Sequence, residues 1–250
     1  MPDTAVALVV IGFTFLLAGW VKGVVGMGLP TVAMGALSLV MPPVTAAALL
    51  VVPSFVTNVW QLAAGPALRI VARRLAGMMI GVCVGTGFGI GFLTSGSSTW
   101  PSIALGAVLA IYAAAGLFLG RFSVPTRAEP WLSPIVGLVT GVLTGATGVF
   151  VVPAVPYLSA LGFEREAMIQ ALGLSFTVST IALAAALAFT ASYPAALALS
   201  SAAAVVPALV GMFVGQRVRE KLDPQAFRRW FFWAMLAVGI VMIVRAVGSR

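Results

Sequence analysis

The pattern of hydrophobic and polar positions divides the chain into eight long apolar regions joined by short polar connections. Six regions have the length of one membrane-spanning helix, which takes about 20 residues. They lie at about 44–64, 75–95, 100–120, 168–190, 195–216 and 228–247. Two further regions, about 5–41 and 132–161, exceed one span and are interrupted by glycine and proline. The pattern predicts an all-α polytopic membrane protein.

Composition supports this prediction, because 61% of the residues are hydrophobic and only 8% are charged. A soluble domain of this size needs a more polar surface. The first residues carry no basic segment, so we expect the first apolar run to be retained in the membrane rather than cleaved. A single cysteine, Cys83, excludes an internal disulfide, and the absence of histidine removes a common metal ligand. We therefore expect no metal site and no cofactor.

Basic residues gather in three of the connections, near 65–74, 121–131 and 217–229, whereas "TSGSSTWPS" and "TASYP" are uncharged. Lysine and arginine favour the cytoplasmic side of a membrane, so this pattern predicts that the three basic connections lie inside and the N-terminus outside. The net charge of +8 is thus interpreted as a set of topology signals and not as a nucleic-acid-binding surface. The residues are Arg69, Arg73, Arg74, Arg121, Arg127, Arg217, Arg219, Lys221, Arg228 and Arg229. Two other arginines, Arg245 and Arg250, fall on the outer side and disagree mildly with this scheme.

The region 132–161 must begin and end on one face. The connection before it is predicted inside, and the connection 162–167 must also lie inside if the span 168–190 leads out to "TASYP". Its 30 residues are too few for two full crossings, which take about 40. We therefore predict a broken or re-entrant helical hairpin bent at "TGATGVFVVP", and a second one in 5–41 bent at "KGVVGMGLP". Non-helical backbone at this depth is tolerated where it is buried in protein or lines a polar cavity.

The two hairpins open two related halves of the chain. The motif Gly-x-x-x-Gly recurs at 19–23 and 137–141, and "PSFVTNVWQL" at 53–62 matches "LSFTVSTIAL" at 174–183. In both halves the order is a bent hairpin followed by three spans. The sequence therefore contains an internal repeat.

The charges of corresponding connections are opposite in the two halves, since each basic connection matches an uncharged one. Two copies with opposite charge bias are expected to insert in opposite orientations. We therefore expect two inverted repeats, 1–125 and 126–250, which together form one transporter domain. Inverted repeats with interrupted helices are typical of secondary transporters, whose substrate site lies between the repeats.

Two stretches, "AGWVKGVVGMGLPTVA" and "GLVTGVLTGATGVFVVPAVPYLSALGF", resemble the glycine-rich motifs of the TauE/SafE family of bacterial membrane permeases, which includes sulfite exporters. The resemblance covers most of the chain. It implies a multi-pass carrier of the bacterial inner membrane for small anions, often sulfur oxyanions or organosulfonates. Many members have a G-G-G run in the second motif, where this chain reads Gly145-Ala146-Thr147-Gly148.

All acidic residues lie in or beside predicted connections, so no predicted span holds a carboxylate. Cation carriers and proton-coupled pumps usually need such a group, and its absence argues against both classes. The residues are Asp3, Glu129, Glu164, Glu166, Glu220 and Asp223.

Lys22 is the one ionisable residue of the first half that the pattern places well inside the membrane. We expect it to supply positive charge to an anion site, while Gly23, Gly26 and Gly28 allow backbone amides to approach an oxyanion closely. The alternative is that Lys22 ends a helix and extends its ammonium to the cytoplasmic surface.

Neutral polar residues after each hairpin form the rest of the candidate substrate site. Four of them have the spacing i, i+3, i+4 and i+7, which places them on one helix face, and others lie in the second half. The first-half residues are Ser54, Thr57, Asn58 and Gln61. In the second half, the hairpin itself offers Thr144, Thr147 and backbone amides at Gly145 and Gly148, with Thr140 at the position that matches Lys22, and the helix after it offers Gln170, Ser175 and Ser179. The alternative is that these side chains hold helices together by hydrogen bonds.

The leading hypothesis is a secondary transporter of small anions that works by alternating access between the two hairpins. Because the cell interior is negative, export of an anion gains about 2.3 kcal/mol per charge per 100 mV, which favours an exporter. The alternatives are an importer of an organic anion or a permease for another small metabolite. Two other classes are less favoured. An intramembrane enzyme would have only serine, threonine and Lys22 at membrane depth, without a G-x-S-x-G motif or metal-ligand spacing, and a non-transporting subunit would need a docking surface that no long loop or soluble domain offers. The sequence leaves open whether the protein is a monomer or a homodimer.

Overall fold

The computed structural model describes residues 4–63, 65–96, 99–118, 123–219 and 221–248. Over these residues all regular secondary structure is α-helical, and eight candidate membrane spans match the eight predicted apolar regions. Arg121 and Arg250 from the topology prediction, and Asp3 and Glu220 from the set of acidic residues, lie outside the described residues. The helices are α1 (Thr4–Val25), α2 (Leu29–Leu37), α3 (Pro43–Ala63), α4 (Leu68–Leu93), α5 (Thr99–Phe118), α6 (Glu129–Thr147), α7 (Ala154–Ala160), α8 (Arg165–Phe189), α9 (Ala195–Ala203), α10 (Val205–Val218) and α11 (Pro224–Gly248).

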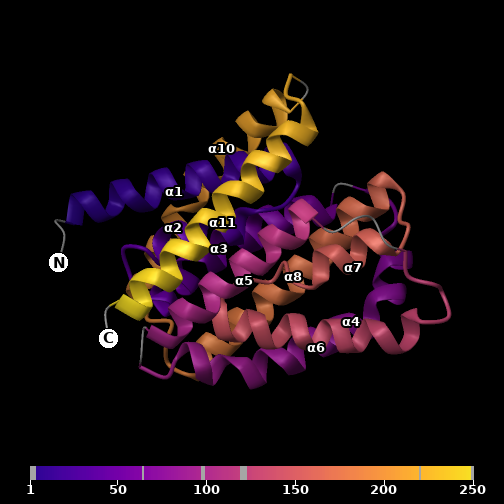
Figure 1. Cartoon of the computed structure of the whole chain (residues 1–250), viewed down its shortest axis with the longest axis horizontal. Coiled ribbons are helices and arrows are strands. Elements are labelled where there is room, and N and C mark those ends of the chain that lie inside the picture. The colour runs from indigo at the N-terminus through magenta and orange to yellow at the C-terminus, as the bar shows by residue number, and fades with distance from the viewer. Residues whose placement is uncertain (1–3, 64, 97–98, 119–122, 220, 249–250) are drawn as a thin grey trace.

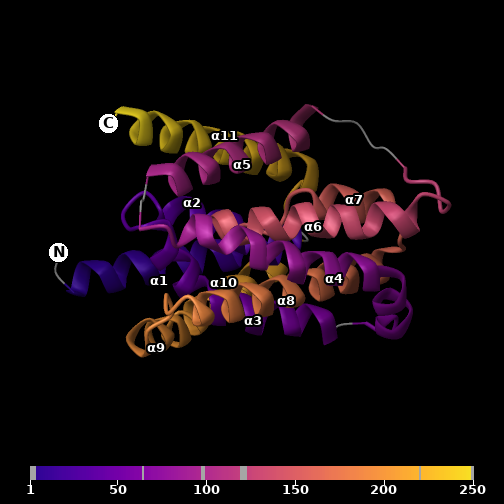
Figure 2. The same cartoon turned by 90° about the horizontal axis from the view of Figure 1, so that it is seen from below.

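Each of the main helix pairs joins a helix of the first half to a helix of the second half. α4 packs along α6, α1 along α10, α5 along α11 and α3 along α8 (Figures 1 and 2). The start of α1 and the end of α11 lie on the same side, at the left of both views. The two halves are therefore interlocked in a single helix bundle.

Both predicted hairpins are broken at glycines with positive φ angles. Gly26 (φ 83°) and Gly28 (φ 109°) separate α1 from α2, and Gly148 (φ 74°) separates α6 from α7. This backbone conformation is favourable for glycine because it lacks a Cβ atom. The predicted break positions are confirmed, and the two arms of each hairpin prove unequal. α1 and α6 are long enough to span a membrane, whereas α2 and α7 have only 9 and 7 residues.

The second hairpin begins and ends at the same end of the bundle, as the sequence predicts. Arg74 on α4 donates hydrogen bonds to Glu129 at the start of α6, over 2.8 Å from Nε to Oε2 and 2.6 Å from Nη2 to Oε1. The same guanidinium donates to the carbonyl of Leu161, which follows α7, over 2.9 Å. Because one side chain reaches both ends of the hairpin, its two arms return to a common level.

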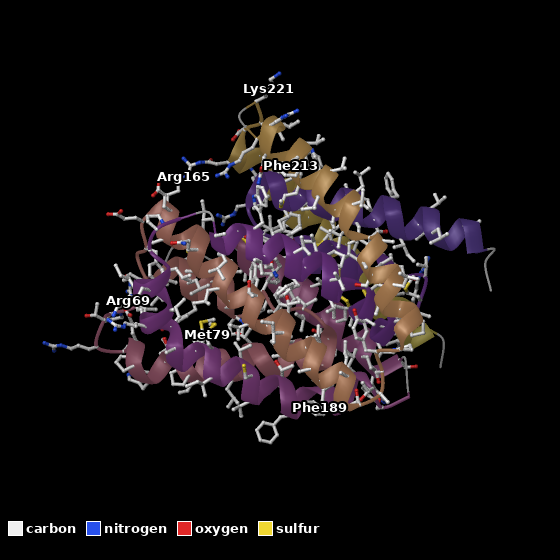
Figure 3. The ribbon with its side chains drawn as sticks, turned by 180° about the vertical axis from the view of Figure 1, so that it is seen from behind. Arg69, Met79, Arg165, Phe189, Phe213 and Lys221 are labelled. Carbon is white, nitrogen blue, oxygen red and sulfur yellow. The ribbon has the colours of Figure 1, made fainter. Side chains whose placement is uncertain are left out.

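Basic side chains project from one edge of the molecule. Figure 3 shows Arg69, Arg165 and Lys221 along the left and upper edges, with Phe189 on the opposite side. The connections near 65–74, 162–167 and 217–229, which the sequence predicts on one face, thus lie toward a common side.

The helix boundaries differ from the prediction in several places. The residues 217–229 are predicted as a loop, but α10 extends to Val218 and α11 begins at Pro224, so Arg228 and Arg229 lie in the first turns of α11. The residues 65–74 were expected as a loop, but α4 begins at Leu68, so Arg69 and Arg73 lie in its first turns. Arginine is a good helix former and its long side chain reaches water from a helix end, so the apolar run alone misplaces the boundary. The span predicted at 195–216 is divided into α9 and α10 just before Pro207, whose ring disfavours continuous helix.

α4 and α6 pack through interdigitated glycines. A Cβ atom at Gly81 would lie 2.4 Å from the carbonyl oxygen of Pro134, and one at Gly85 would lie 2.2 Å from that of Leu138. No side chain fits in such a contact, so the two backbones touch along several turns.

α1 and α10 repeat this arrangement in the other part of the bundle. A Cβ atom at Gly19 would lie 2.1 Å from the carbonyl oxygen of Ala208, and one at Gly215 would lie 2.2 Å from that of Trp20. Stripes of small residues thus allow close packing of α1 and α10 as well.

Candidate functional site

The candidate site is centred on Lys22, which lies in the last turn of α1 and is 3% exposed. Its ammonium donates hydrogen bonds to the Thr57 hydroxyl, 3.1 Å away, and to the side-chain oxygen of Asn58. Both partners belong to α3. The alternative expectation, an ammonium at the membrane surface, is therefore wrong.

The partners of Lys22 carry no negative charge. Among the described residues the salt bridge between Arg74 and Glu129 is the one ion pair, and Lys22 is bonded to neutral oxygens. The described acidic residues lie at helix ends or in connections, namely Glu129, Glu164, Glu166 and Asp223. A buried ammonium is costly unless an anion and further hydrogen bonds compensate it, and the described partners of Lys22 supply hydrogen bonds without an anion.

The two oxygens that face Lys22 are held in place by other hydrogen bonds. The Thr57 hydroxyl donates to the Pro53 carbonyl over 2.8 Å, which leaves its lone pairs for the ammonium. The Asn58 amide nitrogen donates to the Thr180 hydroxyl on α8 over 3.2 Å, which directs its oxygen toward Lys22. An ammonium only donates hydrogen bonds, so this orientation of the Asn58 amide gives Lys22 an acceptor and gives the amide nitrogen an acceptor on Thr180.

Thr180 is a site residue that the sequence reasoning missed. The comparison of the two halves singled out the neighbouring Ser179, and the hydroxyl that reaches Asn58 belongs to the next residue. Alignment of the two halves could not show which side of α8 faces α3, because that depends on how the two helices cross.

The polar positions of α3 form one buried face, as their spacing predicts. Ser54, Thr57, Asn58 and Gln61 are between 0% and 8% exposed. The Gln61 amide nitrogen donates to the Gly26 carbonyl over 3.0 Å, which connects this face to the first hairpin bend. The α3 face therefore contacts α1, the bend and α8 together.

Several buried polar atoms in this region have no hydrogen-bond partner among the described residues. In folded proteins nearly all such atoms are paired with protein or water, so each unpaired one is a candidate contact for a bound molecule. They are Ser54 Oγ, Gln61 Oε1, Thr140 Oγ1, Ser175 Oγ and Ser179 Oγ.

α3 and α8, which carry four of these atoms, run antiparallel past each other. A Cβ atom at Gly173 would lie 2.7 Å from the Leu62 nitrogen, while Asn58 bonds to Thr180 further along α8. Position numbers thus rise along α8 as they fall along α3. The polar segments 54–61 and 175–180 consequently lie beside one another.

The two hairpins meet at the second bend. A Cβ atom at Gly148 would lie 2.9 Å from Cε of Met34, which belongs to the short arm α2 of the first hairpin. At this bend the hydroxyls of Thr144 and Thr147 donate to carbonyls of their own helix, over 2.7 and 2.6 Å. The structure therefore places the second bend against the short arm of the first hairpin but does not bring these two hydroxyls to Lys22.

Three other predicted site residues make different contacts. Gly23 and Gly145 lie inside α1 and α6, where Cβ atoms would lie 2.2 Å from the Met212 carbonyl oxygen and 2.5 Å from that of Thr86. Both glycines thus serve helix packing. Gln170 accepts a hydrogen bond from the Ala67 amide over 2.6 Å and donates to the carbonyls of Leu62 and Gly65, which braces the connection between α3 and α4.

A comparison with known proteins identifies the family. The family described as "Sulfite exporter TauE/SafE" matches residues 11–242, a range that includes Lys22, both bends and the polar faces of α3 and α8. No curated protein and no solved structure matches the chain. The match covers most of the sequence and agrees with the helical bundle and its eight candidate spans. The chain therefore belongs to the TauE/SafE sulfite exporter family and is a membrane transporter, not an enzyme.

Proposed function

We propose that this transporter exports small anions, sulfite or organosulfonates, by alternating access around Lys22. The observation that carries the proposal is the buried ammonium whose described partners are the neutral oxygens of Thr57 and Asn58. Such a group gains most from a ligand that supplies negative charge.

An oxyanion would bind by exchange of hydrogen bonds on the ammonium. The oxygens of the anion would replace the side-chain oxygens of Thr57 and Asn58 as acceptors of the Lys22 hydrogen bonds. Both kinds of oxygen accept hydrogen bonds, but only those of the anion carry negative charge. Hydroxyls without a described partner, those of Ser54, Ser175 and Ser179, would donate to the remaining oxygens. Neutral donors hold a partly dehydrated anion without adding a further buried charge.

The helix contacts support an arrangement of two inverted repeats. If α1 and α2 correspond to α6 and α7, then α4 corresponds to α9 and α10, and the pairs α1–α10 and α6–α4 are equivalent. The pairs α3–α8 and α5–α11 would each join a helix to its own counterpart. A two-fold relation of this kind is expected for repeats that insert in opposite orientations.

This arrangement suggests which parts move. Glycine contacts lock α1 to α10 and α4 to α6, so each pair would move as a unit. The α3–α8 crossing, where Asn58 meets Thr180, lies between the two pairs. Rocking of one pair against the other would expose Lys22 first to one side of the membrane and then to the other.

We place the basic edge of the molecule in the cytoplasm, which puts the start of α1 outside. Single cysteines at exposed positions of opposite edges, Ser95→Cys and Lys221→Cys, test this orientation in a Cys83→Ser background. A membrane-impermeant maleimide applied to intact cells should label position 95 and not position 221. The reverse pattern would overturn the orientation.

Uptake of labelled sulfite and of a small sulfonate into proteoliposomes at fixed membrane potentials tests the function. We expect anion flux to follow the potential, to fall at least about tenfold in Lys22→Gln and to persist in part in Lys22→Arg, because a charge-assisted hydrogen bond contributes about 1.5–3 kcal/mol. Lys221→Gln is the matched control, since it removes the other lysine of the chain, which is exposed.

Two results would contradict the proposal. Normal flux in a folded Lys22→Gln protein would remove Lys22 from the site. If the wild type shows no anion flux but takes up a neutral metabolite tested in the same proteoliposomes, the proposal that the substrate is an anion is wrong.

A further inference from the structure

The hydrogen-bond ladder of α3 is interrupted by Pro53, which lies inside the helix. Proline has no N–H group, so the carbonyl of Leu49, four residues earlier, loses the donor it would have in a continuous helix. Within a membrane such a carbonyl has no water to replace the lost bond, and leaving it unpaired is costly. The break therefore needs a donor from outside α3.

Ser201 on α9 supplies that donor. Its hydroxyl donates to the Leu49 carbonyl over 2.8 Å and accepts a hydrogen bond from the Val52 amide over 3.1 Å. Ser201 is 0% exposed. It lies 152 positions along the chain from Leu49 and 149 positions from Val52. The Ser201 hydroxyl thus replaces the donor that Pro53 lacks and also accepts the hydrogen bond of the Val52 amide, which precedes the proline.

The residues that contact Lys22 lie on the segment of α3 directly after this break. The Thr57 hydroxyl donates to the carbonyl of Pro53 itself, and Asn58 is the next residue. The position of both oxygens therefore depends on the backbone geometry at Pro53. A change in that geometry would move them relative to Lys22, which is held on a different helix.

We propose that Ser201 is a positioning residue of the transporter, which fixes the broken segment of α3 so that Thr57 and Asn58 meet Lys22. Its consequence for transport rests on the proposed function, whereas its consequence for the Lys22 contact does not. The hydrogen bonds of Ser201 go to the backbone of α3, and it acts on Thr57 and Asn58 through that backbone.

A simpler role would be that Ser201 only holds α9 against α3. The two roles differ in their dependence on Pro53. If alanine replaces Pro53, the helix regains an N–H group at this position, and that group can bond to the Leu49 carbonyl. The Ser201 hydroxyl would then no longer be needed at the break and could bond to a carbonyl of its own helix. If Ser201 served only helix association, Ser201→Ala would have the same effect with proline or with alanine at position 53.

Chemical labelling of lysine measures how accessible the Lys22 amine is, and so whether Thr57 and Asn58 still cover it. The chain has two lysines, the buried Lys22 and the exposed Lys221, which serves as the internal reference. A small amine-reactive acylating reagent is applied to the purified full-length protein, and the ratio of labelling at the two lysines is read by mass spectrometry. The proteins are the wild type, Ser201→Ala, Pro53→Ala and the double variant. Ser200→Ala is the matched control, since its hydroxyl donates to Ala196 of its own helix.

We expect Ser201→Ala to raise Lys22 labelling relative to Lys221 at least about threefold, and Ser200→Ala to leave the ratio unchanged. In the Pro53→Ala background, Ser201→Ala should change the ratio less than about 1.5-fold, because the backbone bond is restored. If Ser201→Ala does not accumulate as folded protein, recovery in the double variant supports the proposal. Equal effects of Ser201→Ala in both backgrounds, or failure of the double variant as well, would overturn it.

Anion uptake by the same proteins tests the functional part. Ser201→Ala should raise the KM for the anion about threefold or more with little change in maximal rate at equal protein amount, because the Lys22 contacts are displaced while the moving pairs stay intact. An unchanged KM in a protein with raised Lys22 labelling would overturn the positioning role. If the wild type transports no anion, the proposed function fails, and the labelling cycle still decides whether Ser201 positions α3.

Discussion

Lys22 and Asn58 are 36 positions apart in the chain, and their side chains are joined by a hydrogen bond inside the helix bundle. The ammonium donates to the amide oxygen, which is neutral. The site thus pairs an amine that can carry a positive charge with an acceptor that does not balance that charge. An anion competes well for such a group, and so would a carboxylate built into the chain.

Asn58→Asp is therefore expected to block transport. The carboxylate would pair with Lys22 and occupy the place of the substrate, so anion flux should fall about tenfold or more while the protein remains folded. Uptake into proteoliposomes and the thermal unfolding midpoint measure the two properties. Thr57→Ser keeps the hydroxyl that Lys22 contacts and should transport near the wild-type rate. Wild-type flux in Asn58→Asp would show that the anion does not bind at the Lys22 ammonium.

Gly85→Ala is expected to destabilise the contact between α4 and α6. The added Cβ atom would lie 2.2 Å from the Leu138 carbonyl oxygen, so the two helices must separate. Overpacking of this kind costs about 1–3 kcal/mol or more, which should lower the thermal unfolding midpoint in detergent. Gly87→Ala on the same helix is the control, since nothing lies within 4 Å of its added Cβ atom. That variant should be neutral or more stable, and equal losses in both would contradict the packing interpretation.

Arg74→Gln is expected to loosen the second hairpin at its basic end. The variant loses the paired hydrogen bonds to Glu129, the bond to the Leu161 carbonyl and the contact of the guanidinium with the Phe163 ring, 4.5 Å from its centroid. We expect a loss of about 1.5–3 kcal/mol in the free energy of unfolding, measured by chemical denaturation. Hydrogen exchange at the start of α6 and after α7 should become faster.

The neighbouring Arg73 is the control for this prediction, because it is exposed and has the same charge. Arg73→Gln should change the unfolding free energy by less than about 0.5 kcal/mol. Arg74→Lys should recover only part of the loss, since an ammonium cannot make two parallel hydrogen bonds to one carboxylate. Equal effects of Arg73→Gln and Arg74→Gln would mean that charge, and not the geometry around Glu129, is responsible.

The two hairpin bends should differ in their tolerance of alanine. Gly26→Ala meets nothing within 4 Å and suffers only from its φ angle of 83°, a cost of about 1–2 kcal/mol for a left-handed residue. Gly148→Ala adds a contact of 2.9 Å with Cε of Met34 to a φ angle of 74°. We expect its thermal unfolding midpoint to be the lower of the two. Gly12→Ala, in open space within α1, should cost nothing, and a ranking with Gly26→Ala below Gly148→Ala would contradict the contact between the hairpins.

The sequence by itself determined the parts of this protein that depend on short stretches of chain. The lengths of the apolar runs predicted the spans, since a helix must cover the thickness of the membrane. Clusters of glycine and proline predicted the breaks at Gly26 and Gly148, because these residues change the local backbone. The spacing from Ser54 to Gln61 predicted a common buried face, because the helical period is a local property.

Only the tertiary structure decided what those elements contact. The pattern placed Lys22 inside the membrane but could not choose between a position buried in the protein and one at the surface, and packing against α3 decided this. It assigned Gly23 and Gly145 to the substrate, whereas the structure turns them toward other helices. It missed Thr180 and Ser201 altogether. Each of these contacts joins residues on different helices, and such pairs are set by how whole helices cross, which no local period records.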